Sequence, residues 1–395
     1  MRDTMGRMRR KILVLNERDP ANPLAGGAEV HIFEIFRRLV DRGHEVRLLA
    51  AAFGNAPRRE RIQGVDVHRL VNRYGFYGVA PLAARRHAVR DDFDIVVDVL
   101  NKLPFFSPWF VPRPCFGIVH HLFGATAFQQ VPAPVAAVTW LSERLIPRAY
   151  RDVPMLAISP STKDDLVERG LSPDRVWVVP PGVDTEAYSP AAANPGSPLV
   201  VWIGRLEPYK RAQDLLEALP RVRESIPLAQ AVFVGEGSAR GDLERRAQEL
   251  GLGDVVTFTG FVSEADKVDW LRKATVTVNT SEKEGWGMTV IEGNACGAPS
   301  VSANVHGLRD AVRDGETGLL FPCGDDKALA RCLVRVFSEP GFREELVEKG
   351  SVWAQRFSWD RVADDTMSLI EYALGENQGP VSLRASPFED SPRGD

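Results

Sequence analysis

The sequence predicts an α/β protein with two doubly wound parallel-sheet domains that face a central cleft. Three observations lead to this fold class. The chain has 395 residues, a length that suits two domains of about 150–200 residues each. Short apolar segments alternate with helical patterns in both halves, as expected for parallel sheets covered by helices. A stretch rich in Pro, Gly, Ala and Ser at residues 180–198 is the best linker candidate between the halves.

The first half begins with a βαβ pattern. Residues 11–16 (KILVLN) form a short apolar run typical of a buried parallel strand. Gly26 and Gly27 follow in a loop, and a helix with apolar residues at helical spacing ends at Gly43. Residues 45–50 (EVRLLA) form the second strand. Further strands are expected at residues 93–97, 116–119, 154–158 and 176–179, with a helix at 159–169.

The same rhythm restarts in the second half. Strands are expected at residues 199–203, 231–234, 255–258, 276–279 and 300–302. Helices are expected at residues 240–250, 264–272, 289–295, 325–337, 341–356 and 359–374. The pattern divides the chain into a first domain at residues 1–190 and a second at residues 191–358. The tail at residues 375–395 is rich in Pro, Ser, Gly and charge, and we expect it to be disordered.

The composition restricts the classes of function. Hydrophobic residues make up 44% and charged residues 26% of the chain, which suits a globular protein with two cores. The formal net charge of -4 gives no indication of a nucleic-acid-binding surface. No apolar stretch approaches the roughly 20 residues of a membrane span, and the N-terminal apolar run is too short for a secretory signal. We expect a cytoplasmic protein and leave open a peripheral contact with the inner face of the membrane.

The sequence offers no convincing metal-ligand pattern. The four cysteines form no CxxC pair, and no group of histidines has zinc-ligand spacing. Asp92 and Asp94 are spaced like a DxD metal motif, but they lead into a buried strand, and a capping role is favoured. We therefore expect neither a metal nor another cofactor, and the oligomeric state stays open.

Two cations follow the first strand of the second half. Arg205 comes just after the strand at residues 199–203, and Lys210 follows five residues later at the expected start of a helix. Ligands of open α/β sheets bind at the carboxyl ends of the strands. The pair therefore suits an anionic ligand, although two solvated surface cations are the alternative.

The segment EGWGMTVIE places two carboxylates beside a helix N-terminus. Gly287 allows the backbone to approach a ligand, and the amides of Met288 and Thr289 are free donors at the start of the helix. Glu284 lies in the loop, and Glu292 lies one turn into the helix and points to the same opening. Helix amides suit phosphate, and carboxylates accept hydrogen bonds from hydroxyls. A solvated acidic face is the alternative.

Four segments in this order resemble a known family. GRLEPYK, VGEG, TGFV and EGWGMTVIE together closely resemble the retaining glycosyltransferases of family 4, also called glycosyl transferases group 1. That family has the GT-B fold, which consists of two Rossmann-like domains. The spacing of Glu284 and Glu292, with seven residues between them, is the family's signature. The resemblance covers about residues 11–374 and is stronger in the second half.

The resemblance implies a nucleotide-sugar donor site in the second domain. Arg205 and Lys210 would hold the diphosphate and stabilise the departing nucleotide. Glu284 would contact hydroxyls of the donor sugar, and Glu292 would accept hydrogen bonds from the ribose. The remaining donor-side residues would bring the backbone close to the base, the sugar or the phosphates: Gly235, Phe261, Val262, Gly287, Met288 and Thr289.

The first domain would supply the acceptor side. The pair Gly26–Gly27 resembles the family's glycine loop, whose backbone meets the diphosphate across the cleft. His120, at the end of a strand, matches the family position where a histidine reaches the reacting sugar. His121 is adjacent, and a shift of one residue exchanges their roles. The helix at residues 359–374 is expected to cross back to this domain.

These features predict a retaining transfer from a nucleotide sugar to a hydroxyl acceptor without a metal. A UDP-sugar is the preferred donor and GDP-mannose the second choice, while the acceptor stays open. Two alternatives share the fold: a sugar-nucleotide 2-epimerase, which needs carboxylate and histidine acid–base groups around the sugar, and a non-catalytic module that binds nucleotide sugars.

Overall fold

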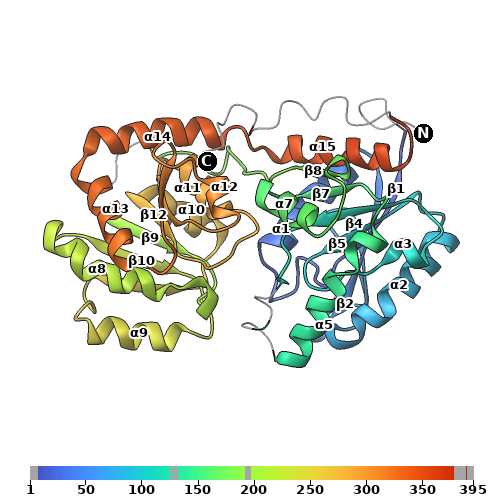
Figure 1. Ribbon diagram of the computed structural model, residues 1–395, viewed down its shortest axis with the longest axis horizontal. Coiled ribbons are helices and arrows are strands. Elements are labelled where there is room, and N and C mark those ends of the chain that lie inside the picture. Colours follow the sequence, from blue (N-terminus) through green and yellow to red (C-terminus); the bar gives the residue numbers. More distant parts are fainter. Residues whose placement is uncertain (1–7, 125–127, 129–131, 192–196, 378–387, 389–395) are drawn as a thin grey trace. The chain divides into compact units, whose positions relative to one another are not determined.

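The chain folds into two compact units in the computed structural model, which describes residues 8–124, 128, 132–191, 197–377 and 388 (Figure 1). Unit 1 comprises Met1–Gly182 together with Trp359–Asp395, and unit 2 comprises Val183–Ser358. The first unit thus ends at Gly182 rather than at residue 190, the boundary predicted from the sequence. Val183 already belongs to unit 2 because its amide donates to the Phe357 carbonyl at 3.0 Å.

Unit 1 is built on one eight-stranded sheet with the order β3-β4-β2-β1-β5-β6-β7-β8. Neighbouring strands are parallel except for the β3–β4 pair. The strands are β1 (Lys11–Leu15), β2 (Glu45–Ala52), β3 (Arg59–Ile62), β4 (Val65–Asn72), β5 (Ile95–Leu100), β6 (Cys115–Val119), β7 (Met155–Ala157) and β8 (Val176–Val178). The strand order reverses direction between β1 and β5, so a ligand is expected at the carboxyl ends of these two strands.

The antiparallel hairpin was missed in the sequence analysis. Strands β3 and β4 are joined by a two-residue turn in which Gln63 and Gly64 have φ angles of 42° and 85°. Two consecutive positive φ angles are those of the tight turns whose twist matches a hairpin. The dipeptide Gln-Gly between Ile62 and Val65 is the only local signal for this turn, and it is weaker than Asn-Gly.

Helices cover both faces of this sheet. They are α1 (Gly27–Asp41), α2 (Arg73–Arg90), α3 (Ser107–Phe110), α5 (Ala133–Glu143), α6 (Ile146–Ala149), α7 (Pro160–Glu168) and α15 (Trp359–Ala373), with a short 3₁₀ turn η2 (Pro173–Arg175). The last helix, α15, packs against α1, and Arg42 donates to Asp364 at 3.0 Å between them. Strands β1, β5 and β6 are completely buried apart from Lys11, as sequence runs without alternation predict.

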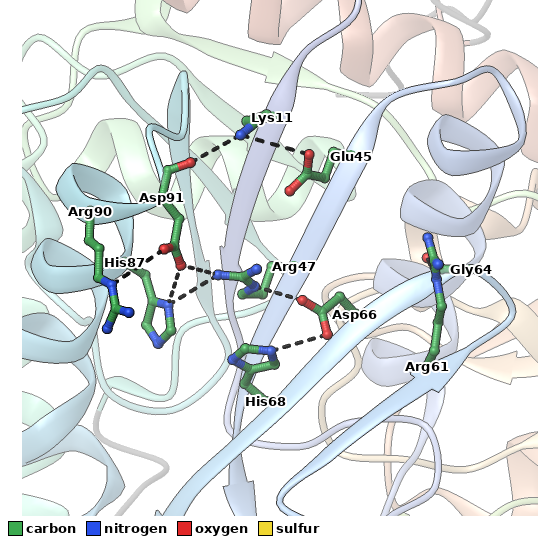
Figure 2. A network of polar contacts seen from close by, with 10 residues as sticks. All are labelled: Lys11, Glu45, Arg47, Arg61, Gly64, Asp66, His68, His87, Arg90 and Asp91. Carbon is green, nitrogen blue, oxygen red and sulfur yellow. Dashed lines mark hydrogen bonds and ion pairs between the residues drawn. The ribbon is translucent and has the colours of Figure 1, made fainter.

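A charged network joins the C-terminal end of α2 to the amino ends of the strands (Figure 2). Arg47 on β2 lies between two carboxylates: it donates to Asp66 of β4 at 2.8 Å and pairs with Asp91 after α2. His87 contacts Asp91 at 3.2 Å and His68 contacts Asp66 at 3.1 Å. Because this network lies at the amino edge of the sheet, it anchors α2 on the side away from the predicted ligand.

Unit 2 contains a fully parallel sheet with the order β11-β10-β9-β12-β13-β14. Its strands are β9 (Leu199–Ile203), β10 (Gln230–Val234), β11 (Val256–Gly260), β12 (Val276–Asn279), β13 (Ser300–Ala303) and β14 (Gly318–Phe321). The last strand was not predicted. The order reverses between β9 and β12, as in dinucleotide-binding sheets, which directs attention to the loops after these two strands.

The helices of unit 2 follow the predicted alternation. They are α8 (Gln213–Ser225), α9 (Arg240–Glu249), α10 (Glu264–Lys273), α11 (Met288–Ala295), α12 (Leu308–Ala311), α13 (Asp326–Ser338) and α14 (Pro340–Ala354), with the 3₁₀ turn η3 (Pro208–Lys210). The prediction of two parallel-sheet α/β domains is therefore confirmed for the residues that the structure describes.

Two segments differ from the sequence-based expectation. The linker candidate at residues 180–198 is held by unit 2 over much of its length, because Tyr188 is buried and Arg272 donates to the Ser189 carbonyl at 2.9 Å. Residues 192–196 lie outside the described part of the chain. The expected disordered tail is attached at its start, where Glu376 pairs with Arg10. Residues 378–387 and 389–395 of that tail lie outside the described residues.

Candidate functional site

The loop after β9 brings two cations to the reversal point of the unit 2 sheet. Arg205 is exposed, and its guanidinium donates to the Tyr209 hydroxyl at 2.9 Å. Lys210 ends η3, and its ammonium group pairs with the Glu284 carboxylate from the loop after β12. The two loops are also joined through the Thr280 hydroxyl, which donates to the Lys210 carbonyl at 2.7 Å. The structure therefore brings together three of the residues that the motifs singled out.

Glu284 is fixed from several sides. The Ser281 hydroxyl donates to its Oε1 atom at 2.7 Å, beside the ammonium group of Lys210. Gly307, with a φ of 81°, lies against the Glu284 backbone, and a Cβ there would be 2.4 Å from the Glu284 carbonyl oxygen. A side chain at position 307 would displace the loop. The carboxylate is thus held in place before any ligand binds.

Helix α11 begins directly after this loop. Gly287 is the residue before its first turn, and the side chains of Met288 and Thr289 are half-buried. The first amides of a helix have no carbonyl partner within the helix and point outward along its axis. Trp286 anchors the loop in the unit 2 core against Phe357, with the ring centroids 5.4 Å apart. The amides of Met288 and Thr289 are therefore presented at a rigid helix start.

Glu292 is buried one turn further along α11. Its Oε1 atom accepts from the Lys267 ammonium group of α10 at 2.9 Å, while its Oε2 atom is buried without a hydrogen-bond partner among the described residues. The pKa of Lys267 is raised: burial alone would lower it, but the charges of Glu292 and Glu264 outweigh burial. An unpartnered buried carboxylate oxygen is costly unless a ligand hydroxyl completes it.

Lys267 is a site residue that the sequence analysis missed. It lies 25 residues before Glu292 in a helix with ordinary surface spacing. Its Nζ atom also lies 5.2 Å from the centroid of the Tyr188 ring. No local motif marks such a residue, because its role arises only when α10 packs beside α11.

Glycines allow the loops at this edge to pack closely. Gly235 has a φ of 138°, and a Cβ there would lie 1.9 Å from the Gly204 carbonyl oxygen. Gly237 would meet the Leu206 carbonyl oxygen at 2.2 Å in the same way. The Gly235 amide donates to the Gly260 carbonyl at 3.0 Å, which joins the loops after β10 and β11. Residues with side chains cannot occupy positions 235 and 237 without moving the loop after β9.

The neighbouring TGFV loop presents one exposed aromatic residue. Phe261 is 87% exposed, whereas Val262 is half-buried and packs on the hydrophobic cluster under the sheet. Val262 thus anchors the loop. Phe261 follows the carboxyl end of β11, and its ring lies in solvent.

The glycine loop of unit 1 leads into α1 after β1. The Gly26 amide donates to the Glu29 carboxylate at 2.7 Å, and this contact caps the helix. Burial raises the pKa of Glu29, although the Gly26 amide and the charge of Arg18 oppose this shift. Gly27 is the first residue of the helix and is exposed.

Polar residues after β1 and β5 meet beside this loop and were not singled out from the sequence. Lys102 contacts both oxygens of the Glu17 carboxylate at 2.9 and 3.0 Å, and the Tyr77 hydroxyl donates to Glu17 at 3.0 Å. The Asn101 side chain donates to Asn16 at 2.9 Å. These residues mark the reversal point of the unit 1 sheet as a second polar edge.

The two adjacent histidines after β6 have different surroundings. His120 is 3% exposed, and its Nε2 atom lies 3.0 Å from Nδ1 of His31 on α1. Burial lowers the pKa of His31 to about 3, and burial together with His31 and His121 lowers the pKa of His120 well below its usual value. Both rings are therefore neutral at pH 7. His121 is only half-buried, and its ring packs on Phe123 at 4.7 Å.

The aspartates of the DxD-like sequence have separate partners. Asp94 accepts from the Lys11 amide at 2.7 Å, and Asp92 pairs with Arg113 at 2.7 Å on the surface. The ring between them, Phe93, is buried. In the part of the chain that the structure describes, no group of three or more His, Cys, Asp or Glu side chains is placed to hold a metal ion.

Both halves of the chain match known families. The family model for glycosyl transferases group 1 matches residues 184–353, and the model for glycosyltransferase family 4 matches residues 25–187. A D-inositol 3-phosphate glycosyltransferase of Acidothermus cellulolyticus is 31% identical and aligns over 91% of this chain and 88% of its own length. A phosphatidyl-myo-inositol mannosyltransferase of Mycobacterium leprae is 30% identical over 88% of this chain and 93% of its own length.

Solved structures share the fold along nearly the whole chain. Sucrose-phosphate synthase of Thermosynechococcus elongatus has a TM-score of 0.78 at 22% identity, covering 93% of this chain and 100% of that structure. HepE of Anabaena in complex with UDP-glucose has a TM-score of 0.74 at 19% identity, covering 92% of this chain and 100% of that structure. At such identities the likeness concerns the fold.

The close approach at Gly235 leads to a stability prediction. We expect Gly235→Ala to destabilise unit 2 by about 2–4 kcal/mol, because the new Cβ collides with the Gly204 carbonyl in a strained backbone conformation. Gly241→Ala is the matched control: a Cβ there meets nothing within 4 Å, and alanine in a helix favours folding by about 0.4–1 kcal/mol. Thermal unfolding of both variants tests this, and an equal stability of the two would contradict it.

Proposed function

Because this chain belongs to glycosyltransferase family 4, we propose that it transfers a sugar from a nucleotide-diphosphate donor to a hydroxyl acceptor with retention of configuration and without a metal. It is a glycosyltransferase with the GT-B fold, as its motifs predicted. The observation that carries the finer proposal is the arrangement around α11: the pairs Lys210–Glu284 and Lys267–Glu292 flank a helix N-terminus at the reversal point of the sheet.

In this proposal unit 2 holds the donor. Arg205 and Lys210 bind the diphosphate, and the amides of Met288 and Thr289 meet its oxygens or the sugar. An ammonium group has three donors, so Lys210 can keep its contact with Glu284 while it binds a phosphate oxygen. Glu284 accepts hydrogen bonds from the sugar hydroxyls. The buried Oε2 atom of Glu292, which has no partner among the described residues, receives a ribose hydroxyl.

In front-face transfer the protein catalyses the reaction by positioning the substrates and by stabilising the developing charge. The bond between the anomeric carbon and the β-phosphate oxygen breaks, and a bond from the acceptor oxygen forms on the same face of the sugar. The acceptor's proton passes to the departing phosphate oxygen. Negative charge grows on the diphosphate during this step, and Arg205 and Lys210 stabilise it without any reorganisation. The two cations thereby supply the charge that a metal supplies in other transferases.

A UDP-sugar is the proposed donor, and GDP-mannose is the second choice. HepE has a similar fold, and its structure is a complex with UDP-glucose. This complex supports a UDP-sugar as the donor. The mannosyltransferase among the relatives supports the second. The Phe261–Val262 loop is proposed to lie beside the base. D-inositol 3-phosphate and phosphatidyl-myo-inositol, which occur in the relatives' names, are the first acceptors to test.

We assign the two histidines different roles. His120 is enclosed by its contact with His31 and supports the loop after β6. His121, which is half-buried, is proposed to reach the reacting sugar. The sequence resemblance favoured His120 for that role, and the burial of its ring is the reason to exchange the assignment.

The arginine after β9 leads to the first kinetic prediction. Arg205→Ala should lower kcat/KM about 100- to 1000-fold, the cost of one lost charged donor at the developing charge. Arg245→Ala on α9 is the matched control, because Arg245 is 70% exposed and pairs with Asp242 on the surface. Steady-state assays with a UDP-sugar measure both variants. An unchanged kcat/KM in Arg205→Ala would refute the assignment.

Donor binding is predicted to depend on Glu292. A nucleoside diphosphate at 100 times its Kd should raise the stability of the protein by about 2.7 kcal/mol. In Glu292→Gln the gain should fall to about half or less, because a hydrogen bond to a carboxylate is worth about 1.5–3 kcal/mol. Glu264→Gln is the control, since Glu264 also contacts Lys267 but lies on the surface. The nucleotide that gives the larger thermal shift, UDP or GDP, is the one that the site binds. If Glu292→Gln and Glu264→Gln show equal thermal shifts, Glu292 does not bind the donor.

The histidine assignment predicts opposite phenotypes. His121→Ala should keep the thermal stability and lower kcat at least about tenfold, as expected for the loss of a positioned sugar contact. His120→Ala should lower the stability by about 2–4 kcal/mol, because it leaves a cavity and an unpaired buried His31. Activity and unfolding temperature are measured on both. A folded, inactive His120→Ala beside a fully active His121→Ala would restore the assignment to His120.

A further inference from the structure

A hollow of about 330 Å³ opens at the amino edge of the unit 1 sheet. It lies where the chain enters β7 and β8, because the residues that line it come before these two strands. They are Arg151, Asp152, Gly170, Leu171, Ser172 and Arg175. The glycine loop and the two histidines after β6 belong to the opposite, carboxyl edge of the sheet. The hollow is therefore separate from the candidate site.

One wall of the hollow is a tight turn before β7. Arg151 and Asp152 form its tip, and the Val153 amide donates to the Tyr150 carbonyl at 3.1 Å to close it. The side chains of Tyr150 and Val153 are buried, whereas those of Arg151 and Asp152 are exposed. The core thus holds the turn from below and leaves its two charged side chains at the surface.

The other wall is the segment between α7 and β8. Gly170 has a φ of 106°, the left-handed conformation that commonly ends a helix. The next residue, Leu171, is buried, and its amide donates to the Leu166 carbonyl at 3.2 Å. The chain therefore turns sharply at the end of α7 and brings Ser172 and Arg175 to the hollow. Both walls are shaped by the backbone and by buried anchors.

The Arg175 guanidinium is oriented by the last turns of α15. Its Nη1 atom donates to the Tyr372 hydroxyl at 3.1 Å. The Tyr372 ring in turn packs edge-on against Trp177 of β8, with the ring centroids 5.3 Å apart. Figure 1 shows β8 close to α15, in agreement with this ring contact. A guanidinium has further N–H donors in a planar fork, so Arg175 can bind a ligand and keep its contact with Tyr372.

The other polar side chains of the hollow are unengaged. In the part of the chain that the structure describes, the side chains of Arg151, Asp152 and Ser172 have no hydrogen bond or ion pair. Two arginines that line one hollow suit a phosphate group, whose oxygens match their paired N–H donors. The Asp152 carboxylate and the Ser172 hydroxyl can accept hydrogen bonds from hydroxyl groups. The set thus combines phosphate donors with hydroxyl acceptors.

We propose that this hollow binds a sugar monophosphate, as a second ligand site of the protein. The phosphate contacts Arg151 and Arg175, and the sugar hydroxyls donate to Asp152 and Ser172. The volume of about 330 Å³ is at the lower end of the roughly 300–1000 Å³ that small-molecule sites have. The hollow accordingly suits a monosaccharide better than a larger nucleotide sugar.

The test is isothermal titration calorimetry of the full chain with ribose 5-phosphate and, separately, with inorganic phosphate. Arg151→Gln and Arg175→Gln should each weaken the binding of ribose 5-phosphate at least about tenfold, because each removes a charged donor. Arg86→Gln is the matched control, since Arg86 is an exposed arginine of unit 1 that does not line the hollow. This control should bind like the parent protein.

A change at Asp152 distinguishes the sugar from the phosphate. Asp152→Asn should weaken the binding of ribose 5-phosphate about fivefold, because an amide oxygen accepts hydrogen bonds from hydroxyls less strongly than a carboxylate. The same change should strengthen the binding of inorganic phosphate, because it removes a negative charge beside the anion. If inorganic phosphate binds the parent protein as tightly as ribose 5-phosphate, the sugar makes no contact and the proposal is wrong.

Further results would also overturn the proposal. If Arg151→Gln and Arg175→Gln bind ribose 5-phosphate like the parent protein, or if Arg86→Gln loses as much affinity, the hollow is not the site. Arg205→Gln on unit 2 should leave this binding unchanged, and a loss in that variant alone would assign the phosphate to the candidate donor site. Unfolding temperatures close to that of the parent verify that the variants fold. No donor, acceptor or transfer takes part, so the result does not depend on the proposed function.

Discussion

The site depends on one constraint, which is that all strands of the unit 2 sheet run parallel. Their carboxyl ends consequently share one edge, and every loop that leaves this edge can reach the same ligand. The strand order reverses between β9 and β12, so the loops after these strands diverge to opposite faces of the sheet. Lys210 from one loop and Glu284 from the other meet across the reversal point. Neither residue would be near the other in an antiparallel sheet of the same sequence.

Close packing turns this edge into a rigid site. The loop after β10 lies against the backbone of the loop after β9 because Gly235 and Gly237 have no side chain. The carboxylates are held by lysines before any donor arrives, Glu284 by Lys210 and Glu292 by Lys267. A preorganised charge array costs little reorganisation when the substrate's own charge develops, and this is the main source of electrostatic catalysis. The Lys267 pair also keeps the buried Glu292 carboxylate from standing alone, which would be costly.

In unit 1, polar residues gather at both the amino edge and the carboxyl edge of the sheet. Apolar residues lie in the core and also on the surface. The network around Arg47 secures α2 at the amino edge, as Figure 2 shows. The carboxyl edge carries the glycine loop, the Glu17–Lys102 pair and the two histidines. With α2 anchored in this way, its arginines stay exposed on the outside, and α5 likewise directs its apolar side outward because Glu143 binds inward. Unit 1 thus keeps its polar edges apart from the exposed apolar side of α5.

The sequence by itself determined the alternation of strands and helices, the two-domain organisation and the order of the donor-side motifs. These features are local, since each depends on apolar periodicity or on residues a few positions apart, such as Glu284 and Glu292. The hairpin of β3 and β4 was missed because Gln63–Gly64 is a weak turn signal. The linker candidate is attached to unit 2 by contacts with Arg272, which is distant in the sequence.

Only the tertiary structure decided which side chains meet and which face outward. Lys267 joins Glu292 because α10 packs beside α11. His31 encloses His120 because the fold brings α1 to the loop that follows β6. Adjacent residues at a strand end point to opposite sides, so no sequence pattern alone distinguishes His120 from His121. The outward face of α5 has the same origin: periodicity reveals that a helix has an apolar side, but the contacts of Glu143 determine where that side points.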